Sequence, residues 1–209
     1  MPSYNAPLRD MRFVINEVFD FNAGYQAFGL EEVTPDLVSA VLDEAAKFTS
    51  SVLAPLNRTG DEEGCSINDG EVTTPAGFKE AYQQYIDNGW GSMTGPAEYG
   101  GQGLPASLGL VLAEMVASAN YSFSMYPGLS HGCQAAIRAH GNDEQKDLYL
   151  NKLVPGTWTG TMCLTEPHCG TDLGLIKTRA VPEADGSYKI TGTKLFISCG
   201  EHDMAENIV

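Results

Sequence analysis

The sequence predicts a mainly α protein, in which an α-helical bundle domain is followed by a truncated β-sheet domain. Between residues 34 and 153, apolar side chains recur every three or four positions, which is the period of amphipathic helices. At Pro155-Gly156 this period gives way to segments with the composition and alternation of strands. We therefore divide the chain into an N-terminal extension (1–33), a helical domain (34–156) and an incomplete β domain (157–209).

The first 33 residues predict one short helix, followed by an irregular segment that connects it to the helical domain. Leu8, Met11, Ile15 and Val18 are spaced by three and four positions, which indicates an amphipathic helix from about residue 8 to 20. Residues 21–33 contain two glycines and are expected to be irregular. The extension is interpreted as a docking arm.

The helical domain has two similar start signals. In Thr34-Pro35-Asp36, threonine is a typical cap, proline suits the first helical position, and the acid meets the positive helix end. The stripe that follows predicts a helix up to Pro55, and the polar residues 58–70 predict a surface excursion. Thr74-Pro75 predicts a second helix that closes at Asn88-Gly89.

Three further helices are predicted before residue 156. The glycine-rich residues 96–103 lack the lysine and the strand-loop-helix context of a phosphate loop, so we interpret them as a turn before a buried helix. Residues 122–140 carry apolar side chains on all sides, which is typical of a central helix or one that lines a cavity. Asn142 and Gln145 form a capping box for a last helix, with leucines facing inward at Leu148, Leu150 and Leu153.

The last fifty residues predict strands. Residues 157–164, 176–181 and 188–199 have strand composition, and Asp185-Gly186 predicts a hairpin between the last two. A further strand begins in residues 205–209. A small sheet of this kind has open edges and little core, so we expect the chain to be a fragment of a longer protein.

Composition excludes several classes of function. The net charge of −15 disfavours nucleic acid and anionic membranes, and any phosphate recognition must be local. Apolar runs are too short for a membrane span, and the N-terminus does not resemble a signal peptide. Five cysteines without a pattern argue against a disulfide framework and for a reducing compartment. We expect a soluble cytoplasmic protein.

Two stretches carry the functional signal. The run 162–172 predicts a strand that ends in a polar bend with Thr165 and Thr171, and in the run 194–200 strand alternation places Phe196 and Ser198 on one face. A flat, partly polar ligand such as a flavin dinucleotide would use a stacking ring and hydroxyls of this kind. The alternative is a half-buried strand whose aromatic side chain belongs to the core.

The order of these motifs resembles the flavin-binding segment of the acyl-CoA dehydrogenases. It reads Met162-x-Leu-Thr-Glu-Pro-x-x-Gly-Thr-Asp172, then Ile176-Lys-Thr178, then Tyr188-x-Ile-Thr-Gly-x-Lys-x-Phe-Ile-Ser198. The resemblance implies that Thr165 contacts the flavin pyrimidine edge and that Gly170 and Thr171 hold the pyrophosphate, with Thr171 also touching acyl-CoA. Phe196 and Ser198 would lie against the ring. The implied FAD-contacting set is Met162, Leu164, Thr165, Gly170, Thr171, Phe196, Ile197 and Ser198.

The chain departs from the family pattern at two places. Phe196 stands where tryptophan is usual, which keeps a stacking face, and His168-Cys169 replaces a pair of small residues, which leaves the loop shape open. The resemblance also makes the helix of residues 122–140 a wall of the acyl pocket, with Leu129 and Cys133 as contacts for the acyl tail. The alternative is that Leu129 and Cys133 pack in the core of the helical domain. The run Tyr4 to Phe13 is similar to the extension of a subgroup that includes methylmercaptopropionyl-CoA dehydrogenases.

The family resemblance implies an oxidoreductase of fatty acid metabolism. Such a flavoprotein uses FAD to dehydrogenate an acyl-CoA thioester between its α and β carbons, passes electrons to an electron-transfer flavoprotein, and forms dimers or tetramers. The family's catalytic glutamate lies far toward the C-terminus. We therefore expect no catalytic residue in this chain, weak flavin binding and no turnover by residues 1–209 alone.

Other chemistries fit the sequence less well. His131, Cys133, His168, Cys169 and Cys199 lack the spacing of zinc sites, so no metal is expected. No nucleophile motif of a hydrolase occurs. Glu166 could be a general base or a loop carboxylate bonded to backbone donors. Two alternatives stay open for the whole protein: a non-catalytic helical acyl-binding or interaction module, and a flavin oxidase or monooxygenase on the same scaffold.

Overall fold

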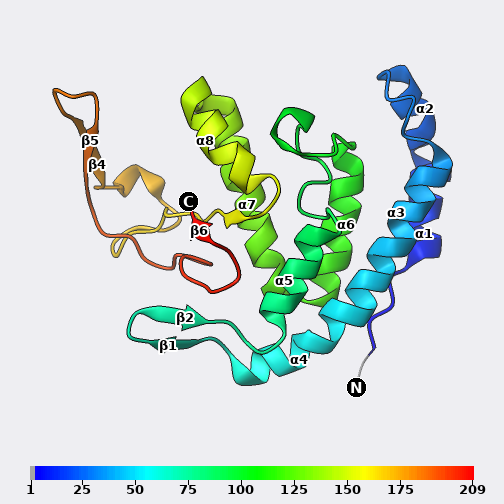
Figure 1. Cartoon of the computed structure of the whole chain (residues 1–209), viewed down its shortest axis with the longest axis horizontal. Helices are drawn as coiled ribbons and strands as arrows, with labels where there is room; N and C mark the ends of the chain where they lie inside the picture. Colours follow the sequence, from blue (N-terminus) through cyan, green and yellow to red (C-terminus); the bar gives the residue numbers. More distant parts are fainter. Residues whose placement is uncertain (1–2) are drawn as a thin grey trace.

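The structure is a computed structural model that describes residues 3–209, and it confirms the mainly α fold class (Figure 1). Helices make up most of the chain up to residue 153, with one strand pair at residues 66–73, and short strands and loops follow. The helical elements are α1 (Leu8–Phe13), the π-helical η1 (Val14–Val18), α2 (Phe21–Ala27), α3 (Pro35–Phe48), the π-helical η2 (Thr49–Leu53), α4 (Ala54–Glu63), α5 (Phe78–Asp87), the 3-10 turn η3 (Ala97–Tyr99), α6 (Ala106–Ala119), α7 (Tyr121–His140) and α8 (Asp143–Leu153).

The core lies among α3, α5, α6 and α7. Its largest fully buried side chain is Phe123, whose ring centroid lies 6.0 Å from that of Phe78 and 6.0 Å from that of Tyr85. Leu42 of α3 and Met115 of α6 are also buried in this cluster. The interdigitated aromatic and aliphatic side chains therefore hold the bundle together by burial of apolar surface.

The predicted start signals of two helices, α3 and α8, are confirmed. The Thr34 hydroxyl accepts the Leu37 N–H at 3.2 Å, with Pro35 as the first residue of α3. Asn142 and Gln145 form the reciprocal capping box of α8. Both devices satisfy N–H groups that have no partner inside a helix.

The predicted end of the α3 helix at Pro55 is wrong, and residues 58–63 are helical rather than a surface excursion. The helix continues through η2 into α4, with Pro55 in the first turn of α4. The wider π turn accommodates the proline ring and its missing N–H. The hydroxyls of Thr49, Ser50 and Ser51 donate to backbone carbonyls four residues earlier.

Residues 21–33 were expected to be irregular, but α2 occupies Phe21–Ala27. Asp20 caps it by accepting the Ala23 N–H at 3.2 Å, and the Tyr25 hydroxyl lies 2.7 Å from the Ser107 hydroxyl at the start of α6. Tertiary contact therefore overrides the low helix propensity of Gly24.

The Thr74-Pro75 start signal is also wrong, because α5 begins at Phe78 after the left-handed Gly77. Thr74 instead donates its N–H and its hydroxyl to Asp203. In α8, Leu148 is exposed rather than inward, whereas Leu150 and Leu153 are buried as expected.

Strands form three two-stranded sheets within residues 3–209. Antiparallel pairs are β1 (Ser66–Asn68) with β2 (Glu71–Thr73), and β4 (Arg179–Pro182) with β5 (Tyr188–Thr191). β3 (Trp158–Thr159) pairs in parallel with β6 (Asn207–Ile208). The β4–β5 pair, which projects away from the bundle in Figure 1, confirms the predicted hairpin, and β6 confirms the predicted last strand.

The strands are shorter than predicted. The segment 157–164 is a strand only at β3, the segment 176–181 becomes one only at Arg179, and the segment 188–199 stops at Thr191. Strand composition extends the backbone only where a neighbouring strand supplies ladder hydrogen bonds. Residues 162–164 and 192–199 belong to none of the strand pairs of residues 3–209, and the ladder next to β3 ends with the Thr161 N–H bond to the Val209 carbonyl.

The helix α7 lies between α6, α8 and β3 and lines a cavity, as its all-round apolar pattern predicts. The cavity measures about 440 Å³ and is bounded by α5, α6 and α7. Within residues 3–209, no helix has both the length and the apolar character needed to cross a bilayer.

Candidate functional site

The two motifs singled out by the sequence lie side by side. The Leu195 N–H donates to the Thr165 carbonyl at 2.9 Å, and the Thr161 hydroxyl donates to the Ser198 carbonyl at 2.6 Å. Residues 161–165 and 195–198 therefore run next to each other although about thirty residues separate them in sequence.

The segment around Phe196 is not the strand that we predicted. Phe196 and Cys199 have φ angles of 56° and 58°, and the Gly200 N–H closes a turn onto the Ile197 carbonyl at 3.2 Å. Left-handed residues are incompatible with an extended strand, so alternation does not set the directions of Phe196 and Ser198. The Phe196 ring is 85% exposed and is not part of the core.

The predicted flavin contacts combine solvent-facing hydroxyls that have no protein partner with exposed apolar side chains. Within residues 3–209, the hydroxyls of Thr165, Thr171 and Ser198 make no hydrogen bond. The apolar members Met162, Leu164 and Ile197 are exposed, and so are Gly170 and Thr171. Exposed rings and free hydroxyls together suit a ligand that is both flat and polar.

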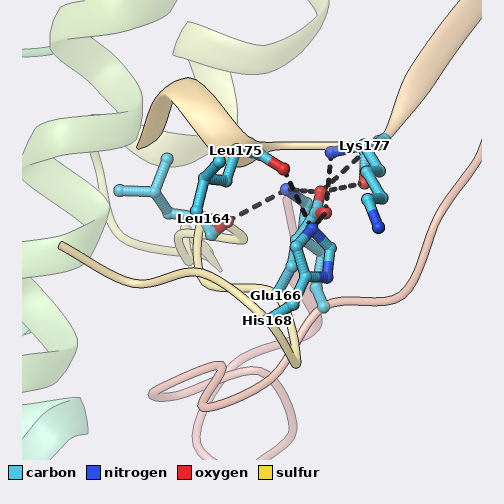
Figure 2. Close-up of polar contacts among 7 residues, drawn as sticks. Leu164, Glu166, His168, Leu175 and Lys177 are labelled. Carbon is cyan, nitrogen blue, oxygen red and sulfur yellow. Dashed lines mark hydrogen bonds and ion pairs between the residues drawn. The ribbon is translucent and has the colours of Figure 1, made fainter. Parts of the chain in front are cut away.

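Glu166 holds the bend in place (Figure 2). It is 3% exposed, and its carboxylate accepts the Lys177 N–H at 2.8 Å and the Thr178 N–H at 3.0 Å. The Thr178 hydroxyl and the Lys194 ammonium also donate to it, the ammonium at 2.9 Å. One carboxylate thereby joins three segments that are distant in sequence.

These contacts favour the structural interpretation of Glu166 over that of a general base. Hydrogen bonds from Thr178, Lys177 and Lys194 hold the pKa of the Glu166 carboxyl well below its usual range. A general base near neutral pH needs a pKa closer to the working pH and an open lone pair. Glu166 has neither, so its role is to shape the loop.

The substitution of His168-Cys169 for two small residues does not open the loop. The Glu166 N–H and the Cys169 N–H each donate to the other residue's carbonyl, at 2.9 and 3.1 Å. The His168 ring lies beside Glu166, with its Nε2 2.9 Å from the Leu175 carbonyl and 3.4 Å from Glu166 Oε2 (Figure 2). The ring thereby ties the loop to η4 (Leu173–Leu175).

Glu166, His168 and Cys169 place one potential metal ligand each within 4.8 Å of the others. The Lys194 ammonium and two backbone N–H groups already occupy the Glu166 carboxylate. A cation would have to displace Lys194, so the donor set does not favour a metal.

Sequence reasoning missed Lys194 and Thr178, which orient Glu166. Both lie in the quoted motifs, and a lysine next to a strand-like run in an acidic chain is the signal that could have indicated an ion pair. It also missed His202 and Asp203, which lie just after the second motif and contact the helical domain. No local pattern marks those two residues.

The candidate acyl contacts Leu129 and Cys133 lie on α7 but do not line the 440 Å³ cavity, whose α7 wall includes Ser124, Pro127 and His131. Leu129 is half-buried. Cys133 packs against Gly160, where an added Cβ would lie 2.4 Å from the Cys133 Cβ. Burial raises the pKa of the Cys133 thiol.

Comparison with known proteins places these motifs in a family. Residues 36–157 match the family described as acyl-CoA dehydrogenase, N-terminal domain. This chain belongs to the acyl-CoA dehydrogenase family. It is 44% identical over 207 residues to the 3-methylmercaptopropionyl-CoA dehydrogenase of Ruegeria pomeroyi, a match that covers 99% of this chain and 35% of that protein.

Solved structures of other proteins share the fold of this chain. A chain in the structure of the electron transferring flavoprotein of Acidaminococcus fermentans has a TM-score of 0.67 at 27% identity, over 80% of this chain and 41% of that one. An acyl-CoA dehydrogenase complexed with FAD from Bacillus anthracis has a TM-score of 0.64 at 26% identity, over 80% and 27% of the two chains. The chain spans about a third of the length of the curated relatives it matches.

Proposed function

We propose that this chain is the N-terminal part of an FAD-dependent acyl-CoA dehydrogenase that oxidises an acyl-CoA thioester between its α and β carbons. The observation that carries the proposal is the pairing of residues 161–165 with 195–198, which places Thr165 and Ser198, whose hydroxyls bond to no protein group, in adjacent segments that also carry exposed apolar side chains. The FAD complex of the similar Bacillus anthracis acyl-CoA dehydrogenase supports the choice of cofactor.

The residues present fit this cofactor. Thr165 and Ser198 would donate hydrogen bonds to the polar edge of the flavin ring, and Phe196 offers an exposed face for it. Gly170 and Thr171 lie on the bend that would hold the pyrophosphate, and Met162, Leu164 and Ile197 complete the set. FAD supplies a two-electron acceptor when bound.

Within residues 3–209, the one carboxylate inside the first motif that accepts several hydrogen bonds is Glu166, and these bonds commit it to the loop. We therefore infer that the base that takes the α proton lies outside this chain, and that residues 1–209 do not turn over substrate. Thr171 would touch the acyl-CoA, and Leu129 and Cys133 are proposed contacts for its tail. The proposed division at residues 33 and 156 places these contacts on both sides of the second boundary.

The electron acceptor in this proposal is an electron-transfer flavoprotein, and the assembly is a homodimer or homotetramer. Similarity to a chain in the structure of the electron transferring flavoprotein of Acidaminococcus fermentans supports the acceptor. The 44% identity to the Ruegeria pomeroyi enzyme makes 3-methylmercaptopropionyl-CoA the first substrate to assay. An oxidase would instead consume oxygen without an added acceptor.

The test uses the complete polypeptide that contains these residues. We expect a yellow protein that reduces an electron-transfer flavoprotein in the presence of acyl-CoA. Thr165→Val and Ser198→Ala should each weaken FAD binding about threefold to tenfold, the worth of one hydrogen bond. Ser122→Ala, which removes an exposed hydroxyl of α7, should not. A colourless protein, or FAD affinity unchanged in both variants, would contradict the proposal.

A further inference from the structure

The proposed flavin segment Leu195–Gly200 is held by few hydrogen bonds, and Cys199 is its one side chain that packs against the core cluster of the described residues. It makes no strand ladder, and it contains two non-glycine residues, Phe196 and Cys199, with positive φ. Its contacts with the first motif are the Leu195 N–H to Thr165 bond and the Thr161 hydroxyl to Ser198 bond. A strained, exposed segment keeps one conformation only if the surrounding structure enforces it.

Residues His202–Met204, which follow this segment after Glu201, contact the helical domain, and we call them the tail anchor. Asp203 Oδ1 accepts the Thr74 N–H at 3.1 Å and the Thr74 hydroxyl at 2.7 Å. Partial burial opposes the ionisation of Asp203, but the bonds from Thr74 outweigh it, so its pKa is lowered. Met204 is buried in the core cluster of the helical domain.

His202 fixes the tail anchor on the other side. It is 4% exposed, and its Nε2 lies 3.0 Å from the Thr159 hydroxyl in β3. Its Nδ1 accepts the Met204 N–H at 3.2 Å, which assigns the proton to Nε2. The ring also meets Tyr126 of α7 edge-on, with centroids 5.1 Å apart. The anchor therefore contacts α7, β3 and the segment before α5 at once.

We propose that Asp203 and His202 are positioning residues for the flavin segment. They hold the chain just after Gly200 against Thr74, Thr159 and α7, and so fix the end of the flavin segment relative to the helical domain. This inference rests on the proposed FAD-binding role of residues 195–200. It assigns no contact between the anchor and the flavin itself.

The test compares Asp203→Ala with the matched variant Asp185→Ala. Asp185 also accepts two bonds from one residue, the N–H and hydroxyl of Ser187, but it lies in the β4–β5 turn. In the 209-residue chain, the amides of residues 195–200 should exchange about tenfold faster in Asp203→Ala, the effect of losing a charged hydrogen bond. Asp185→Ala should exchange like the unmodified chain.

Two further variants separate positioning from simple loss of structure. Thr74→Val removes one of the two bonds and should give a smaller increase in exchange, whereas Thr74→Ser keeps both and should restore the original rate. In the complete flavoprotein, Asp203→Ala should shift the visible flavin spectrum and weaken FAD binding, and Asp185→Ala should do neither.

The inference is overturned if Asp203→Ala leaves the exchange of residues 195–200 unchanged, if Asp185→Ala accelerates it equally, or if Thr74→Ser behaves like Thr74→Val. A complete protein without FAD would overturn the proposed function, and the exchange comparison would still decide whether the tail anchor positions this segment.

Discussion

The helical domain and the residues after 156 are ordered by different interactions. In the helical domain, the buried side chains are mostly large and apolar, such as Phe123, Met115 and Leu53. After residue 156, the buried set is Thr159, Glu166, Cys169, His202 and Met204. Hydrogen bonds to buried polar groups therefore replace apolar burial in the region that carries the flavin motifs, and directional bonds specify loop shapes that burial alone does not.

The largest effect is expected from a cavity in the helical core. Phe123→Ala should lower the free energy of unfolding by about 3–5 kcal/mol, because the ring is fully buried between Phe78 and Tyr85. The free energy of unfolding is measured by urea denaturation, with far-UV circular dichroism as the signal. Phe28→Ala, at an 83% exposed position, should change the unfolding free energy by less than about 0.5 kcal/mol. Similar losses in both variants would show that Phe123 is not central to the core.

Removal of the Glu166 carboxylate should have a local effect, whereas Phe123→Ala should destabilise the whole helical domain. Glu166→Ala should accelerate amide exchange at Lys177 and Thr178 on the order of tenfold or more, because both N–H groups lose their acceptor. The urea midpoint of the helices should be nearly unchanged. Glu183→Ala, which removes an exposed carboxylate near the β4–β5 turn, is the control. Global unfolding by Glu166→Ala would mean that the two regions do not differ as described.

The contrast between apolar burial in the helical domain and polar contacts after residue 156 explains which features the sequence could predict. Caps at Thr34 and Asn142 depend on neighbours three residues away, and both are confirmed. The adjacency of the two flavin motifs was predicted from their resemblance to a family. The conformation of residues 192–199 was not, because it depends on the Lys194 to Glu166 pair and on a Thr74 to Asp203 contact between residues 129 positions apart.

The α2 helix is a second element whose conformation depends on a contact that is distant in sequence. The two glycines of residues 21–33 suggested irregular structure, since glycine is costly inside a helix. The Asp20 cap and the contact between Tyr25 and Ser107 form the helix nonetheless. Local composition predicted the element wrongly because a residue 82 positions away supplies the stabilising contact.

The tail anchor should make the second region sensitive to pH. Burial lowers the pKa of His202 from its ordinary 6.5, although Glu201 and Asp203 oppose the shift. The unfolded state then binds more protons than the folded state, so the stability of the anchor is complete above pH 6.5 and is lost as the pH falls below it. The protection factors of the amides of residues 195–200, which correct for the intrinsic pH dependence of exchange, should fall as the pH is lowered from 7 to 5.

A histidine swap checks the origin of this pH dependence. His202→Gln keeps a neutral side chain with a donor and an acceptor, and should remove the fall in protection factor between pH 7 and pH 5. His140→Gln, which replaces an exposed histidine at the end of α7, should retain it. The lowered pKa of Asp203 places its own contribution at a lower pH, below its ordinary 3.8. A pH dependence that survives in His202→Gln would exclude His202 as its source.

The smallest effect is expected at Gly24, in the middle of α2. Nothing lies within 4 Å of a Cβ added there, so alanine meets no clash and restricts the unfolded chain. Gly24→Ala should therefore raise the free energy of unfolding by about 0.5–1 kcal/mol. Gly29→Ala is the matched control: its surroundings are equally open, but its φ of 71° disfavours any side chain, so it should destabilise. If both variants stabilise the protein equally, the gain comes from the unfolded chain alone and says nothing about α2. If Gly24→Ala destabilises it, then α2 is not the regular helix that the Asp20 cap and the Tyr25 contact indicate.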